Sequence, residues 1–166
     1  MKKVGYILVM ASLVTVSATA DVHSRNNKQS ISYRAHEMFP KDFSNAKNAS
    51  WSRDGEFNEV SFEQNKVPLK AFYDWNGDLI GTTQKMDYNE LPPATRQNIE
   101  KQYKKYTVDR VILYNDNDQN LNNLYPLLPE ESNVNYFVSL KKEDSPNMVI
   151  LKIDPDGIVS FFEDRR

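Results

Sequence analysis

Two similar stretches decide the fold, "YDWNGDL" at residues 73–79 and "IDPDGIV" at residues 153–159. Each contains Asp-x-(Asn/Asp)-Gly, a pattern that fits either a metal-binding loop or a tight hairpin turn. A calcium loop of the EF-hand type needs Gly at its sixth position and Glu at its twelfth. Here Gly is fourth, and the twelfth residue counted from Asp74 is Lys85. We therefore predict the same hairpin turn used twice, because Asp and Asn side chains hydrogen-bond to nearby backbone and tolerate turn conformations.

Alternating apolar and polar residues around the first turn predict an antiparallel meander. The four expected strands are "NASWSR" (48–53), "EFNEVSFEQ" (56–64), "VPLKAFYD" (67–74) and "DLIGTTQKM" (78–86). The strands are expected to be joined at Asp54-Gly55, Asn65-Lys66 and Asn76-Gly77. Asp-Gly and Asn-Gly are strong hairpin signals, because both central residues of a type I′ turn need positive φ. Four further strand-like segments follow, namely "VDRVILY" (108–114), "VNYFVSLKK" (134–142), "NMVILKID" (147–154) and "GIVSFFED" (157–164).

A helical period precedes each set of strands. The segment 31–47 spaces its apolar residues for a short helix, although Pro40 must break or kink it. The segment 91–107 predicts a second helix, with proline near its first turn. The order of one helix and then four strands occurs twice, which predicts an α+β fold: a tandem duplicated helix plus four-stranded antiparallel meander. The first α/β repeat is expected at 31–90 and the second at 91–166, and the two are expected to pack against one another.

The first twenty residues have the features of an export signal. Lys2 and Lys3 precede an apolar stretch too short for a good membrane span, and Ala18-Thr19-Ala20 supplies a small-residue cleavage site. We expect residues 1–20 to be a cleaved signal peptide, with an uncleaved anchor as the alternative, and residues 21–30 to be a disordered polar tail. The mature protein is then periplasmic or secreted, without stable insertion in a membrane.

Composition argues against several classes of function. Loss of Lys2 and Lys3 leaves 19 basic against 23 acidic residues, a net charge of −4, and the basic residues are scattered. This balance argues against a nucleic-acid partner and against a polybasic membrane patch. The densest basic cluster, "KQYKK" (101–105), is interpreted as a solvated helix face. The chain has no Cys, so neither disulfides nor thiol chemistry is available to it.

Residues suited to catalysis are sparse. Of the two histidines, His23 lies in the expected tail and His36 in the short helix, so neither is expected to act as a catalytic base. Two His without Cys give no zinc-ligand pattern. Asp116 and Asp118, in "NDNDQN" (115–120), are weak calcium candidates, a solvated loop being the alternative. We predict a protein that is not an enzyme and has no cofactor, with a hydrolase that uses paired carboxylates as the remaining catalytic alternative.

Several of these elements together resemble a known family. Trp51 with "GEFNEVSFE", then "VPLKAFYDWNGDLIGT", then "LPPATRQNIEKQY", is similar to the PepSY-like, beta-lactamase-inhibitor-like domain of exported bacterial proteins. The resemblance covers roughly residues 35–163. It implies a tandem α+β fold in which antiparallel sheets carry helices on one side. The family name records a likeness in fold to an inhibitor protein and does not make this chain an inhibitor of beta-lactamases.

The predicted function is an exported, non-catalytic binding module, inhibitor-like, acting on a periplasmic or extracellular protein of unknown identity. The partner-binding candidates are Asp74, Trp75, Asp78, Tyr114 and Tyr125. Trp75 leads because a Trp at the second position of a hairpin turn is hard to bury within its own strand pair; the alternative is that it folds back on a helix or repeat. Tyr114 and Tyr125 flank or lie in the polar insertion 115–133, where exposure is expected. The alternative function is an envelope sensor that binds a small ligand or an ion.

Overall fold

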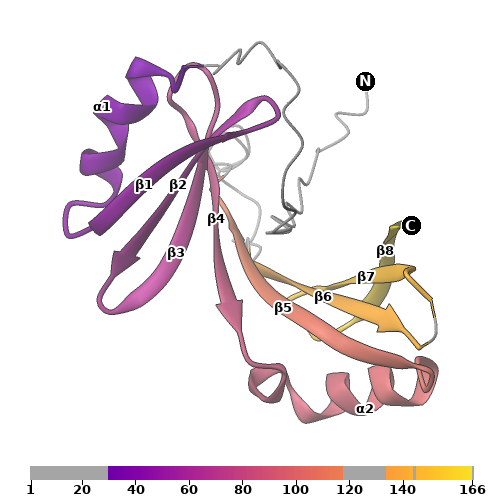
Figure 1. The fold of residues 1–166 in the computed structure, drawn as a ribbon. Helices are drawn as coiled ribbons and strands as arrows, with labels where there is room; N and C mark the ends of the chain where they lie inside the picture. The colour runs from indigo at the N-terminus through magenta and orange to yellow at the C-terminus, as the bar shows by residue number, and fades with distance from the viewer. Residues whose placement is uncertain (1–29, 118–133, 144, 166) are drawn as a thin grey trace, which may run out of the picture.

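One continuous antiparallel sheet forms most of the molecule in the computed structural model, which describes residues 30–117, 134–143 and 145–165 (Figure 1). The elements in chain order are α1 (Tyr33–Asp42), β1 (Lys47–Asp54), β2 (Phe57–Gln64), β3 (Val67–Tyr73), β4 (Leu79–Met86), the 3-10 helix η1 (Tyr88–Glu90), α2 (Pro93–Gln102), β5 (Tyr106–Asp116), β6 (Val134–Lys142), β7 (Met148–Ile153) and β8 (Val159–Arg165). The eight strands lie side by side in sequence order. The signal peptide predicted at 1–20, nearly all of the predicted tail at 21–30, Asp118 and Tyr125 lie outside the described residues.

The prediction of two packed repeats, each a helix with its own four-stranded meander, is wrong. Strand β4 pairs directly with β5, from Gly81 opposite Asp116 to Met86 opposite Val111, so all eight strands belong to one sheet. The two groups of strands are joined edge to edge, and two short α-helices cover the sheet. The predicted boundary between residues 90 and 91 falls in the connection between η1 and α2; as a domain boundary it stays a prediction.

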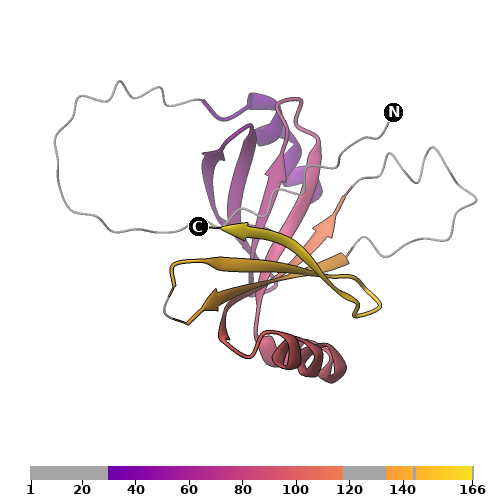
Figure 2. The same ribbon diagram turned by 90° about the vertical axis from the view of Figure 1, so that its right-hand side faces the viewer.

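Both helices cover the same face of the sheet. Val60 of β2 packs with α1 and lies opposite Ala71. Ala71 is opposite Thr82, and Thr82 is opposite Asn115. Alternation along β5 then places Val111, which packs with α2, on that same face. Figures 1 and 2 show the two helices on one side of a strongly bent sheet, and we call the opposite side the helix-free face.

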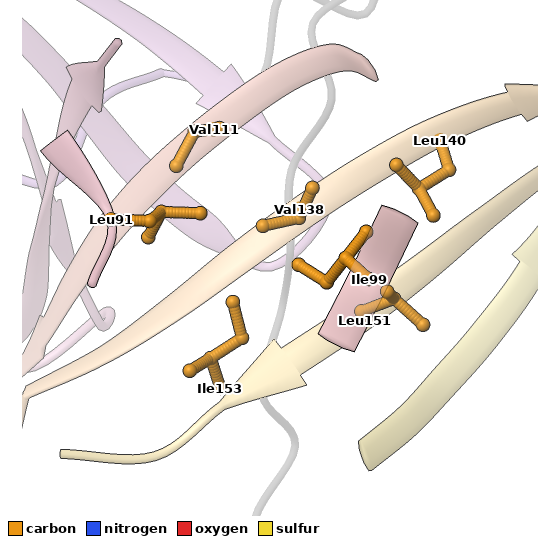
Figure 3. Close-up of a cluster of buried hydrophobic side chains, with 7 residues drawn as sticks. All are labelled: Leu91, Ile99, Val111, Val138, Leu140, Leu151 and Ile153. Carbon is orange, nitrogen blue, oxygen red and sulfur yellow. The ribbon is translucent and has the colours of Figure 1, made fainter. Parts of the chain in front are cut away.

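Each helix packs on a hydrophobic cluster of its own. Ala35 and Phe39 of α1 are buried against residues that include Val60, Phe62, Ala71 and Tyr73. Ile99 of α2 lies over the second cluster, whose buried members are Leu91, Ile99, Val111, Val138, Leu140, Leu151 and Ile153 (Figure 3). Helix α1 ends at Asp42, and not at residue 47 as predicted, two residues beyond Pro40, which cannot donate a helical hydrogen bond. Among the described residues, no helix has the length and apolar character needed to cross a membrane.

The two Asp-x-(Asn/Asp)-Gly stretches are hairpin turns of one geometry, as predicted. In the first, the Gly77 N–H donates to the Asp74 carbonyl (3.3 Å), and the Asp78 N–H donates to Asp74 Oδ1 (2.9 Å). Asp154 accepts the equivalent two bonds in the second turn, at 3.0 and 2.8 Å. Gly77 and Gly157 have φ of 86° and 84°. Each supplies the residue with left-handed backbone conformation that closes a three-residue hairpin loop.

The expected type I′ turn lies at a different hairpin. Neither Asp54 nor Asn76 has positive φ, so neither the Asp54-Gly55 nor the Asn76-Gly77 dipeptide forms the type I′ turn that its sequence suggested. Asn65 and Lys66, between β2 and β3, have φ of 53° and 68°, and these two residues do meet the type I′ requirement. The signal at Asn76-Gly77 therefore located a hairpin correctly but not its loop length.

Candidate functional site

The hairpin between β3 and β4 is docked on the first turn of α1. The Ser32 hydroxyl, at the start of the helix, donates to the Trp75 carbonyl at 2.9 Å. Gly77 approaches the helix so closely that a Cβ there would lie 2.8 Å from the Arg34 carbonyl carbon. Only glycine fits this position, because it supplies both the positive φ and the close approach. The loop that carries Trp75 is thus held by the helix as well as by its own turn.

Asn58 of β2 connects this hairpin to the start of α1 through hydrogen bonds of its side chain. Its side chain is fully buried on the face that α1 covers. Asn58 Oδ1 accepts from the Ser32 N–H at 2.8 Å, and Asn58 Nδ2 donates to the Asp74 carbonyl at 2.9 Å. The Tyr73 carbonyl is a second acceptor at 3.4 Å. A buried amide satisfied in this way fixes the relative position of the helix, the hairpin and β2.

Trp75 is 58% exposed, although its backbone is fixed. The guanidinium carbon of Arg53 lies 5.5 Å from the centroid of the indole ring, a cation–π distance. Arg53 is itself held, because it donates to the Gly55 carbonyl (3.2 Å) and to Asn58 Oδ1 (3.4 Å). Tyr33, which follows Ser32 in the chain, is 75% exposed. We call Arg53 and Trp75 the hairpin patch.

The two aspartates of the hairpin have different positions. Asp74 has its carboxylate engaged within the turn, where Oδ1 accepts from the Asp78 N–H and Oδ2 accepts from Asn76 Nδ2 at 3.3 Å. Asp78 is exposed at the end of the loop. In the described part of the chain, no three or more His, Cys, Asp or Glu side chains are grouped as metal ligands. The arrangement is that of a structural turn which presents Trp75.

The structure does not bring Tyr114 to the hairpin patch. Tyr114 lies on the helix-free face, across Gly81 of β4, where an added Cβ would meet its ring at 2.8 Å. It is partly buried and stacks edge-on against Phe137, with ring centroids 6.3 Å apart. Asp116 lies at the end of the same strand, opposite Gly81. His36 is exposed on α1, with its ring centroid 4.3 Å from that of Trp51.

The pKa values of Tyr73 and Asp54, in the first half of the sheet, are raised. Burial, followed by the hydrogen bond from its hydroxyl to Asp42 Oδ2 (2.9 Å), raises the pKa of Tyr73 far above its ordinary value. Burial, followed by the nearby Glu59 carboxylate, raises the pKa of Asp54. Neither group belongs to a set of three or more potential metal ligands among the described residues. The shifts therefore describe how the first half of the sheet is packed.

Sequence reasoning missed the residues that support the hairpin patch. Asn58, Ser32 and Arg53 were not among the candidates, yet they hold the loop and the indole. One signal was present in the sequence: Asn58 alternates with Val60 and Phe62 and so occupies a position on the buried face. A polar residue at such a position needs internal hydrogen-bond partners, which makes it a marker of a buried polar junction. No comparable pattern marks Arg53.

The single bent antiparallel sheet of this chain, covered on one face by two short helices, is similar to the BLIP-like fold. The chain is similar to a BLIP-like protein from Bacteroides fragilis, with a TM-score of 0.58 and 17% identity over 82% of this chain and 86% of that chain. It is also similar to a DUF2874 family protein from Bacteroides ovatus, with a TM-score of 0.61 and 16% identity over 82% and 87%. A predicted periplasmic protein from Bacteroides eggerthii gives a TM-score of 0.62 and 11% identity over 82% and 88%.

These similarities establish a shared fold. They confirm the beta-lactamase-inhibitor-like part of the predicted resemblance as a statement about architecture. The PepSY part stays a prediction. No family model matches this sequence, and a search of curated proteins gave no match.

Proposed function

We propose that this chain is an exported, non-catalytic binding module that engages a protein partner in the periplasm or outside the cell. Export is supported by the signal-like residues 1–20 and by the description of one structural neighbour as a predicted periplasmic protein. The binding role is supported by the hairpin patch and by the likeness of the fold to a BLIP-like protein. A more specific proposal is that the protein inhibits an enzyme. If the captured partner is an enzyme, measuring its activity with and without the added protein tests this.

The observation that carries the proposal is an exposed Trp75 on a loop with a fixed backbone. Trp and Arg are enriched among the residues that dominate binding energy at protein interfaces, and both occur in this patch. The loop is held by Ser32 and Asn58, so little conformational entropy is lost when a partner covers the indole. Because 58% of Trp75 is accessible, a partner can bury a large aromatic surface there.

The test is affinity capture from periplasmic and culture-supernatant extracts with the mature protein, followed by purification of the captured protein and measurement of its Kd. We expect Trp75→Ala to weaken binding by about 30-fold or more, the effect of losing a hot-spot aromatic residue. Phe161→Ala is the matched control, because Phe161 is 62% exposed on β8, away from the hairpin patch. Equal affinity of wild type and Trp75→Ala, or no retained protein at several salt concentrations, would contradict the proposal.

The second hypothesis, binding of a small ligand, draws on a different part of the molecule. A pocket of about 440 Å³ opens between strands β2 to β5, and its lining includes three basic side chains. It shares no lining residue with the hairpin patch. Binding at the two places is therefore separable by mutation.

A further inference from the structure

The pocket lies on the helix-free face. Ser61 of β2 is opposite Lys70 of β3, and Lys70 is opposite Thr83 of β4, so the three side chains form one row across the sheet. Lys85 is opposite Ile112 of β5 and belongs to the neighbouring row on that face. All five residues line the pocket, and each alternates along its strand with residues on the helix-covered face.

The size and lining of the pocket suit a small organic molecule. Ligand pockets in proteins hold about 300–1,000 Å³ and combine mostly apolar walls with a few polar groups, and this pocket has a volume of about 440 Å³. Pro68 and Ile112 supply apolar surface on the helix-free face, and the hydroxyls of Ser61 and Thr83 supply neutral hydrogen-bonding groups. The wall therefore offers both a surface for a hydrocarbon tail and polar groups that can fix its orientation.

The charge of the lining has one sign. Lys70, Lys85 and Arg110 are the charged residues of the pocket wall, and among the described residues that line it there is no Asp or Glu. Lys70 is paired with Glu59, Nζ to Oε1 at 2.7 Å. In the described parts of the chain, the ion pairs are Lys70–Glu59 and Arg165–Glu163, so Lys85 and Arg110 face the pocket without a carboxylate partner. Two such cations beside apolar walls favour an anionic group, and a guanidinium binds a carboxylate or sulfate through two parallel hydrogen bonds.

We propose that this pocket binds a small amphiphilic anion, with a carboxylate or sulfate head at Lys85 and Arg110 and an apolar tail on Pro68 and Ile112. Lys70 keeps its pairing with Glu59, so the anionic head is assigned to Lys85 and Arg110. The negative net charge of the whole chain makes this local concentration of cations a feature of the pocket and not of the overall composition.

The experiment is a titration of the isotope-labelled mature protein followed through its backbone amide NMR signals. Octanoate is the probe, octanamide is its neutral counterpart, and acetate is the anion without a tail. We expect octanoate to shift the amides of Thr83, Lys85, Arg110 and Ile112, and to bind at least about tenfold more tightly than either control, because charge and tail are both needed. Added salt weakens the binding, since the cations are partly exposed.

Variants locate the site and separate it from the hairpin patch. Arg110→Gln and Lys85→Gln each lower octanoate affinity about tenfold, whereas Arg110→Lys keeps part of it. Lys152→Gln is the control, because Lys152 lies opposite Phe137 on the same face but does not line the pocket. Trp75→Ala leaves octanoate binding unchanged, so failure here is distinct from failure of protein binding. Equal binding of octanamide, shifts confined to other residues, or no shifts with octanoate up to its solubility limit would overturn the proposal.

Discussion

Asn58 is the residue on which the geometry of the hairpin patch depends most. We predict that Asn58→Ala lowers the free energy of unfolding by about 1–3 kcal/mol, because the Ser32 N–H and the Asp74 carbonyl lose their partner in a buried site. Urea denaturation measures the change. Asn98→Ala is the control: Asn98 is exposed on α2, and its replacement is expected to stay within about 0.5 kcal/mol of wild type. Equal stabilities of the two variants would show that the buried amide does not tie the elements together.

Tyr73 gives the protein a predictable response to alkaline pH. The pKa of Tyr73 is higher in the folded state than its value of about 10 in the unfolded state. The contribution of Tyr73 to stability is therefore complete below about pH 10 and declines at higher pH, because the unfolded chain then loses its proton first. The decline is at most about 1.4 kcal/mol per pH unit, one proton being involved. We predict that wild type is more stable than Tyr73→Phe at pH 8, and that this difference shrinks above about pH 10.

Denaturation of the two proteins at a series of pH values measures that difference. Tyr103→Phe serves as the control, because Tyr103 packs with Tyr106 in the second cluster, away from Asp42. A gap between wild type and Tyr73→Phe that stays constant from pH 8 to about pH 11 would contradict the assignment.

At the scale of elements, the hairpin between β3 and β4 and helix α1 act as one structural unit. Gly77→Ala places a Cβ 2.8 Å from the Arg34 backbone and also forces alanine into positive φ, so we predict a loss of stability of about 2–3 kcal/mol. Gly55→Ala is a matched control, because Gly55 has φ of 57° but no atom within 4 Å of an added Cβ. It is expected to cost about 1 kcal/mol, the strain alone. Thermal or urea unfolding of both variants measures the difference, and similar losses would argue against the tight contact with α1.

The individual elements could be read from the sequence because their signals are local. Alternation of apolar residues marked the strands, and glycine after Asp or Asn marked the hairpins, since strand facing and turn conformation depend on neighbours in the chain. The end of α1 was placed five residues too late, at residue 47 instead of Asp42, since Phe43 and Ala46 continue the apolar spacing beyond Pro40. Both of these residues lie outside the helix and pack on the hydrophobic cluster that includes Ala35 and Phe39 of α1. Their apolar character is therefore explained by tertiary contacts.

At the scale of the whole molecule, the sequence did not reveal the pairing of β4 with β5. These strands are separated by η1 and α2, and no local pattern states whether two meanders join edge to edge or stack face to face. The site shows the same limit. Trp75 could be chosen from its place in a turn, whereas its contact with Arg53 joins two hairpins, and the pocket joins four strands. Such groups of side chains form when strands that are distant in sequence pair with one another. Local sequence patterns do not show which distant strands will pair.

The continuous sheet predicts that the two halves unfold together. Leu151 is fully buried under α2, so Leu151→Ala is expected to cost about 2–5 kcal/mol. Both tryptophans, Trp51 and Trp75, lie in the other half of the sheet, and their fluorescence is expected to report the same loss as circular dichroism. Val108→Ala, a change at a more exposed position of β5, is the control. A fluorescence transition that does not move while circular dichroism reports early unfolding would show that the halves are independent.

The two ends of the sheet bear on how the protein behaves when it is concentrated. Strands β1 and β8 are its outer strands, and open edges are templates on which other chains can add. The pairing of β1 is irregular between Lys47 and Ser50, where Asn48 has φ of 55°, and the pairing of β8 with β7 shifts register between Ile150 and Leu151. Bulges of this kind twist an edge and interrupt its row of hydrogen-bonding groups. Both edge strands are therefore poor templates for the addition of further strands. We expect concentrated solutions of the protein to resist fibril formation.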